Sequence, residues 1–275
     1  MITFDHAVVN VLGEMEPAAA RYSGLGFSLT PRGYHTLGSI NHLAVFGDNY
    51  LELLGYAPGE REKRAELWEH PAGLTGLAFR VADAAALHEA MASSGLPVEP
   101  WKDFSRPVML DGKSENARFR TFQLDRSYTD NGRIFFCEHK TPELIWRPEY
   151  MRHANGVTGI AAAAIACTDP NAITAILAAT PGIRRDGDEI ILAGDVRLRF
   201  ARIDTLAEIF AGEPVPGLNG RRMRMSSLDL LCTSLDRVAA LLDSQSIPHK
   251  RTEEAIQLGS NAAAGLILRF VTGRG

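Results

Sequence analysis

The sequence has few cysteines, no long apolar run and no excess of basic residues, and each absence excludes a class of protein. Its three cysteines, Cys137, Cys167 and Cys232, are widely spaced and form no CxxC pair, so we expect neither a disulfide framework nor a zinc motif. The longest apolar run, residues 159–167, is well short of the ~18 residues that a membrane-spanning helix needs. We therefore expect a cytoplasmic protein without a membrane partner.

The charge balance excludes another class of partner. A formal net charge of -4 gives no concentrated basic face for phosphate binding, so we expect no nucleic-acid partner. The composition, 45% hydrophobic and 23% charged, is that of a globular chain, and 275 residues allow one large domain or two ordinary ones. A small molecule is the expected partner.

An internal repeat organises the chain. His70 begins HPAGLTGLAFRV and His153 begins HANGVTGIAAAA, so His, Gly, Thr and Gly recur in step. Each stretch continues into a strand-like run, then an Asp, then an alanine-rich helical stretch. Duplication of one supersecondary unit is the natural interpretation.

The first residues contain the same unit in full. A strand pattern at 3–11 precedes a helix pattern at 16–26, and strand-like runs follow at 27–33, 40–48 and 49–56. The order is βαβββ. A truncated copy closes the chain, which gives about four units in tandem.

Four tandem βαβββ units resemble the vicinal oxygen chelate superfamily, which includes glyoxalase, bleomycin resistance and extradiol dioxygenase proteins. Three segments, DHAVVNV, RGYHTLGSINHLAVFGDNYLELLG and FFCEHKTPELIWRPEY, are similar to bacterial glyoxalase-like proteins in particular. The resemblance covers essentially the whole chain. It implies an α+β fold with two half-open barrels of curved sheet, one domain at 1–150 and a degenerate second at 151–275, and a possible homodimer.

The resemblance also implies a divalent metal ion (Zn, Mn, Fe, Co or Ni) held on the first and last strands of each unit. His6 lies at the first-strand position of unit one, and Glu52 and Glu138 lie at the last-strand positions of units one and two. The fourth position falls on Gly76, which has no ligand atom. A cation would explain why Glu138 is tolerated at the end of the apolar run 133–137.

Simpler roles exist for each of these residues. His6 could be a half-buried strand histidine, and Glu52 could pair with a nearby Arg or Lys. Glu138 could form an ion pair with Arg118 or Arg120 on the preceding strand.

Other candidates would contact the substrate. His35 and His42 are interpreted as structural residues, as second donors behind the metal, as a replacement ligand, or as substrate contacts, and His42 could move a proton near neutral pH. Trp146 would either cover the cavity or pack as part of a linker. His139, next to Glu138 on a strand, should point to the opposite face.

The leading functional hypothesis is a metal-dependent lyase or isomerase acting on a small oxygenated organic molecule, with Glu138 or Glu52 as the mobile base. The first alternative is a metal-free protein that sequesters a hydrophobic small molecule or an antibiotic, which Gly76 favours. A dioxygenase is a second alternative, which Gly76 disfavours because the extradiol pattern needs histidines on both first strands.

The second half of the chain has fewer candidate ligands. Gly159 and Asp229 occupy its first-strand positions, and the strands VRLRFARI and GLILRFVTG contain no acidic residue. We therefore expect ligand binding in the first pair of units alone.

Overall fold

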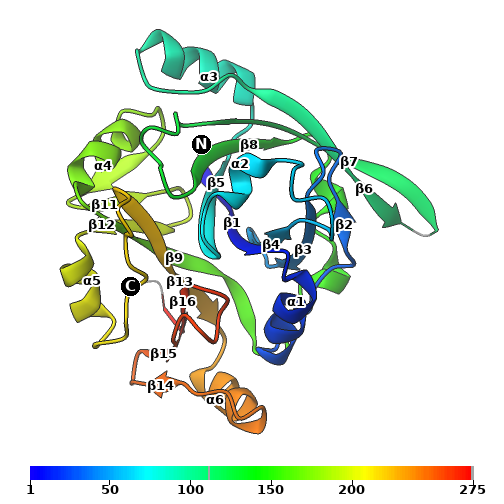
Figure 1. The fold of residues 1–275 in the computed structure, drawn as a ribbon, viewed down its shortest axis with the longest axis vertical. Coiled ribbons are helices and arrows are strands. Elements are labelled where there is room, and N and C mark those ends of the chain that lie inside the picture. Colours follow the sequence, from blue (N-terminus) through cyan, green and yellow to red (C-terminus); the bar gives the residue numbers. More distant parts are fainter. Residues whose placement is uncertain (111, 274–275) are drawn as a thin grey trace.

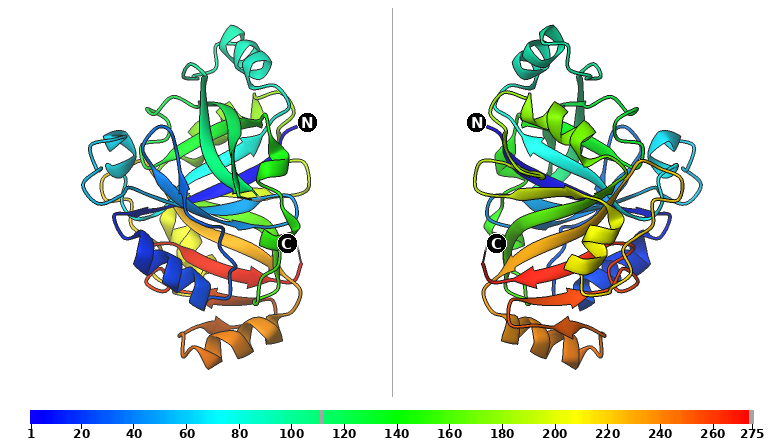
Figure 2. Two further views of the ribbon diagram at one scale, coloured as in Figure 1. Left: turned by 90° about the vertical axis from the view of Figure 1, so that its right-hand side faces the viewer. Right: turned by 90° about the vertical axis from the view of Figure 1, so that its left-hand side faces the viewer.

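Two eight-stranded sheets, each made of two βαβββ units, account for most of the chain (Figure 1). The computed structural model describes residues 1–110 and 112–273, and these counts refer to that part of the chain. The helices are short and lie on the outside of the sheets (Figure 2). The predicted α+β fold of paired curved sheets is confirmed.

The first sheet comes from units one and two and has the strand order β2-β3-β4-β1-β5-β8-β7-β6. Its centre is the antiparallel pair β1/β5, which joins the two units, and each of these strands runs parallel to the last strand of its own unit. The elements are β1 (Thr3–Leu12), α1 (Met15–Gly24), β2 (Gly33–Tyr34), β3 (Ile40–Val45), β4 (Tyr50–Gly55), α2 (Ala65–Trp68), β5 (Gly73–Arg80), α3 (Ala84–Ser93), β6 (Lys102–Leu110), β7 (Lys113–Gln123), β8 (Arg133–His139) and the 3₁₀ turns η1 (Pro142–Leu144) and η2 (Pro148–Tyr150).

The second sheet repeats this arrangement with the order β10-β11-β12-β9-β13-β16-β15-β14. The central antiparallel pair is now β9/β13, with β12 and β16 as the parallel neighbours. The elements are β9 (Val157–Cys167), α4 (Pro170–Ala178), β10 (Arg184–Asp186), β11 (Glu189–Ile191), β12 (Arg197–Ala201), α5 (Ile203–Ile209), β13 (Met223–Cys232), α6 (Leu235–Ser244), β14 (Lys250–Arg251), β15 (Ala255–Leu258) and β16 (Ile267–Val271).

Side-chain caps explain where three of the helices begin. Asp83 accepts a hydrogen bond from the Ala86 amide at the start of α3, and Asp169 and Ser234 cap α4 and α6 in the same way. Each cap satisfies an amide that has no partner inside the helix. The Asp and alanine-rich pattern of the repeat therefore encodes these helices directly.

One hydrophobic core runs through both halves of the chain. Phe27 of the first half and Phe270 of the second stack with ring centroids 6.5 Å apart. Buried His153 joins the halves, because its Nε2 donates to the Val45 carbonyl at 2.9 Å and its Nδ1 accepts from the Ser28 amide at 3.0 Å. The predicted boundary near residue 150 thus lies between two sheets that pack together.

Division into two domains stays a prediction, and residues 274–275 of the predicted second domain lie outside the described residues. Among the helices of the described chain, none combines the length and the apolar character needed to span a bilayer.

Candidate functional site

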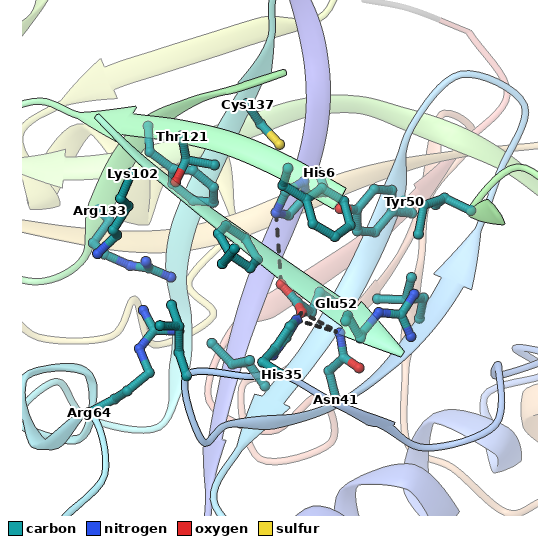
Figure 3. Close-up of a pocket in the computed structure, with 18 residues that line it drawn as sticks. His6, His35, Asn41, Tyr50, Glu52, Arg64, Lys102, Thr121, Arg133 and Cys137 are labelled. Carbon is teal, nitrogen blue, oxygen red and sulfur yellow. Dashed lines mark hydrogen bonds and ion pairs between the residues drawn. The ribbon is translucent and has the colours of Figure 1, made fainter. Parts of the chain in front are cut away.

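A cavity of about 610 Å³, its open mouth included, lies on the first sheet (Figure 3). Strand alternation selects the residues that face it, since successive side chains point to opposite faces. Even-numbered residues of β4 and odd-numbered residues of β8 line it. The polar and charged side chains at the cavity are His6, His35, Asn41, Tyr50, Glu52, Arg64, Lys102, Arg106, Thr121, Arg133 and Cys137.

His6 and Glu52 face one another across this cavity. The His6 Nε2 atom lies 3.7 Å from Oε2 of Glu52, and both side chains are buried. Tyr50 stacks on the imidazole with a centroid distance of 4.3 Å, and Phe135 meets the ring edge-on at 5.3 Å. These contacts fix the plane of the His6 ring.

Asp5 supports His6 from behind. Its Oδ2 atom lies 2.7 Å from Nδ1 of His6 and 2.8 Å from Nε2 of His139, while Oδ1 accepts from Nε of Arg80 at 2.8 Å. Burial alone would raise the pKa of Asp5, but the charges and hydrogen bonds of His139 and His6 outweigh it and hold this pKa well below its usual range. The ionised carboxylate favours the His6 tautomer that is protonated at Nδ1, so Nε2 is free to accept a proton or bind a metal.

Glu52 is also held as a carboxylate. Asn41 on β3 donates its amide hydrogen to Oε1 at 2.6 Å, and Nε2 of His35 lies 3.7 Å from the same oxygen. Burial raises the pKa of Glu52, but the charges that His35 and His6 carry when protonated and the Asn41 hydrogen bond lower it by more, so the net shift is downward. The cavity therefore contains a buried anion able to accept a proton.

His35 is neutral at physiological pH. Burial lowers its pKa to about 4, against the opposing effect of Glu52, and Arg106 adds to the lowering. Its Nδ1 lies 2.9 Å from the Ser39 hydroxyl, in the loop that leads into β3. An uncharged His35 imidazole can donate or accept a hydrogen bond to a substrate, and it adds no positive charge next to Arg64, Arg106 and Arg133.

The prediction that Glu138 joins His6 and Glu52 is corrected by the structure. Cys137 faces the cavity, so its neighbour Glu138 points to the other face of β8. There the carboxylate accepts from the Ala84 amide at 3.1 Å, at the start of α3, and pairs with Lys140. The expected partner Arg120 instead binds Asp103. Glu138 is thus a helix-capping residue.

His42 and Trp146 also lie outside the cavity. On β3, Asn41 and Leu43 face inward, so His42 points away and its Nδ1 lies 2.7 Å from the Thr30 carbonyl. Trp146 packs on His139, with a centroid distance of 4.9 Å, and its ring lies 3.9 Å from the Arg80 guanidinium carbon. It covers the Asp5 network from outside. Neither side chain lines the cavity, so the structure does not place His42 for proton transfer or Trp146 for substrate contact.

The structure explains why glycine occupies the fourth expected ligand position. Gly76 pairs with Val8 across β1 and β5, and a Cβ at residue 76 would lie 2.8 Å from two carbon atoms of Val8. Val8 already fills the space that a ligand side chain would need. The matching position on β8, which pairs two residues further along β5, holds Phe135.

We expect Gly76→Ala to lower the free energy of unfolding by about 1–3 kcal/mol, because the added methyl group overpacks the contact with Val8. Urea denaturation measures this change. Gly24→Ala is the matched control, since a Cβ there meets nothing within 4 Å. Equal stability of the two variants would contradict the explanation.

One further group of possible metal ligands exists among the described residues. Ligand atoms of Asp5, Cys137 and His139 lie within 4.8 Å of one another. Arg80 and two imidazoles already surround this carboxylate, and burial raises the pKa of Cys137 well above its usual value. Asp5 thus already has three charged or hydrogen-bonding partners at this position.

The paired units and the cavity on their shared sheet define the vicinal oxygen chelate superfamily. A family model described as a glyoxalase-like domain matches residues 4–180, more than half of the chain. The chain therefore belongs to the glyoxalase-like domain family. No curated protein sequence matches it.

Solved structures share the fold at low sequence identity. A hypothetical protein from Staphylococcus aureus matches with a TM-score of 0.69 and 14% identity, over 98% of this chain and 99% of the other. 4-Hydroxymandelate synthase from Streptomyces coelicolor, as a mutant, matches with a TM-score of 0.56 and 11% identity, over 98% and 93% of the two chains. A fusion of a xylose isomerase-like TIM barrel with a 4-hydroxyphenylpyruvate dioxygenase matches with a TM-score of 0.57 and 11% sequence identity. The match covers 98% of this chain and 48% of the other.

Proposed function

We propose that this protein is an isomerase or lyase that moves a proton on a small oxygenated organic molecule bound in the first cavity. The observation that carries the proposal is the buried pair of His6 and Glu52, 3.7 Å apart, with Asp5 directly behind the imidazole. A carboxylate held as an anion beside an oriented imidazole is the arrangement that general base catalysis needs.

In this mechanism Glu52 accepts a proton at Oε2 from a carbon next to a carbonyl group and returns it to a neighbouring atom. Asn41 fixes the carboxylate through its other oxygen, so the accepting atom stays aimed at the cavity. The apolar side chains of Leu43, Phe119 and Phe135 line the cavity and exclude water around the reacting atoms.

The fold family implies a divalent metal ion, and two residues fit it well. His6 offers Nε2 as a ligand while Asp5 accepts its other ring hydrogen, the support that metal-binding histidines commonly have. Glu52 offers the adjacent carboxylate, and His35, whose Nε2 lies 3.7 Å from Glu52 Oε1, could supply a third donor. A Zn, Mn, Fe, Co or Ni ion there would bind vicinal oxygens of the substrate and stabilise negative charge on them.

Replacing His6 by alanine is expected to abolish metal binding while leaving the fold intact, because β1 stays packed through the apolar neighbours of His6. Elemental analysis of protein purified without a histidine tag measures the metal content. His42→Ala is the control, since this ring points away from the cavity, and it should retain the metal. Full metal content in His6→Ala would refute the ligand assignment.

The catalytic step is tested separately. In D₂O, the enzyme should exchange a C–H hydrogen next to the carbonyl of a 2-oxo acid or an α-hydroxy ketone for deuterium, followed by proton NMR. The alternative is a binding protein without catalysis. Gly76 and Phe135 favour it, because they occupy the unit-two positions that match His6 and Glu52 and have no side-chain atom that could bind a metal. Protein without stoichiometric metal and without exchange on any member of the panel would support that alternative.

A further inference from the structure

Three cationic side chains from separate segments meet at one side of the cavity. Arg64 precedes α2, Lys102 begins β6 and Arg133 begins β8, and all three line the cavity. Figure 3 places them together, on the side away from Tyr50. We refer to Arg64, Lys102 and Arg133 as the cationic cluster.

The cationic cluster has little compensation from acidic side chains. Within residues 1–110 and 112–273, Lys102 and Arg133 form no ion pair, and Arg64 reaches only Glu66, at 3.5 Å. Burial, together with the charge of Arg64, lowers the pKa of Arg133 to about 9. Burial likewise lowers the pKa of Lys102, as do Arg64 and Arg133. Arg64 and Arg133 are half-buried and Lys102 is exposed. Bringing like charges together at such a site costs free energy, which a bound anion would offset.

A second cavity, on the second sheet and lined by residues of β9, β12, β13 and β16, provides a contrast. There Glu189 binds both Arg197 and Arg199, at 2.9 and 2.5 Å, and Asp229 binds Arg269 at 2.8 Å. The two cavities lie on sheets of the same topology, so the fold itself does not require unpaired cations. Only the first cavity keeps them.

Local geometry holds two members of the cluster in place. Arg64 has a backbone φ of 57°, a left-handed conformation that a residue with a side chain adopts at a cost of about 1–3 kcal/mol. The Arg133 guanidinium carbon lies 4.9 Å from the centre of the Phe135 ring, at the cavity wall. The cation–π contact thus orients the Arg133 guanidinium at the cavity wall, where no acidic side chain of the described residues pairs with it.

We infer that the cationic cluster binds an oxyanion of the substrate, a carboxylate or a phosphate, and so makes the substrate an organic anion. The apolar wall of Phe104, Phe119 and Phe135 would contact its carbon skeleton, while Glu52 faces the reacting carbon. Guanidinium groups match carboxylate and phosphate through paired hydrogen bonds. The inference rests on the proposed function, whose substrate it describes.

Calorimetric titration of the full chain tests it at constant ionic strength. The probes are 2-hydroxybutanoate, its neutral amide 2-hydroxybutanamide, and inorganic phosphate. We expect at least one anion to bind more tightly than the amide, and we expect Arg133→Met and Lys102→Met to weaken that binding about 10- to 100-fold. Arg197→Met, in the second cavity, is the control and should bind as the wild type does.

Thermal unfolding without ligand separates a binding role from a structural one. Because no acidic side chain in the described part of the chain pairs with Arg133, Arg133→Met should unfold at the same temperature as the wild type or at a higher one. Lys102→Met, at an exposed position, provides the same test if Arg133→Met does not fold.

The outcomes distinguish a carboxylate substrate from a phosphorylated one, and they test the anion site separately from the proposed catalytic function. Binding of the carboxylate alone assigns an organic acid, and binding of phosphate alone assigns a phosphorylated substrate. Equal affinity for the amide and the anions, or unchanged anion binding in both Met variants, would overturn the inference. Titration needs no turnover, so loss of deuterium exchange with retained anion binding would reject the proposed function alone.

Discussion

Glu52→Gln is expected to lower the rate of deuterium exchange by about 10²- to 10⁴-fold, the range that a positioned general base contributes. Glutamine keeps the size of the side chain and can still accept from Asn41, but it cannot take a proton. Its thermal stability should therefore remain close to that of the wild type. Proton NMR in D₂O, run with the same substrate panel, gives the rate.

Glu138→Gln is the matched control for this experiment. Glu138 is also a buried strand carboxylate, yet it caps α3 on the far face of β8. Its replacement should leave the exchange rate within a few-fold of the wild type and affect stability instead. An equal loss of exchange in the two variants would show that Glu52 is not the base.

Asp5→Asn is expected to destabilise the fold by about 3–5 kcal/mol near neutral pH, because removing the buried anion leaves Arg80 without its charge partner. Urea denaturation at a series of pH values measures this effect. Asp103→Asn removes an exposed ion pair with Arg120 and should cause a much smaller change.

The pH dependence follows from the lowered pKa of Asp5 in the folded state. A carboxyl group with a lowered folded-state pKa stabilises the protein above its unfolded pKa of about 3.9, and this contribution is lost as the pH falls below that value. The difference in stability between the wild type and Asp5→Asn should therefore shrink below about pH 4. A constant difference down to acid denaturation would contradict the role of the ionised carboxylate.

The sequence predicts the fold well because its signals are local. The Asp83 and Asp169 caps, the alanine-rich stretches and the repeat after His70 and His153 together indicate the βαβββ order. The resemblance to the superfamily places His6 and Glu52 on the first and last strands of unit one, and the structure pairs these strands side by side.

Three features of the site depend on tertiary structure and could not be read from the pattern. Side-chain alternation along β8 puts Glu138 and His139 on opposite faces of the sheet. The sequence pattern does not say which face lies toward the cavity, because that depends on how the sheet curves. A register shift in β1 at Asp5 interrupts alternation, so consecutive Asp5 and His6 join one hydrogen-bond network. The cationic cluster comes from a turn and two strand starts, which no spacing in the sequence connects.

The shared core gives the duplicated chain a division of roles. In the second half the arginines that line the cavity are paired within the protein, so this cavity does not need a bound anion to balance its charge. The first half keeps cations without an acidic partner at its cavity, and their mutual repulsion makes its own folding less favourable. Because Phe27 and Phe270 belong to one core, the folding free energy of one copy supports the other. A duplication of this kind allows one half to evolve a binding site that lowers its own folding stability, while the other half stabilises the shared core.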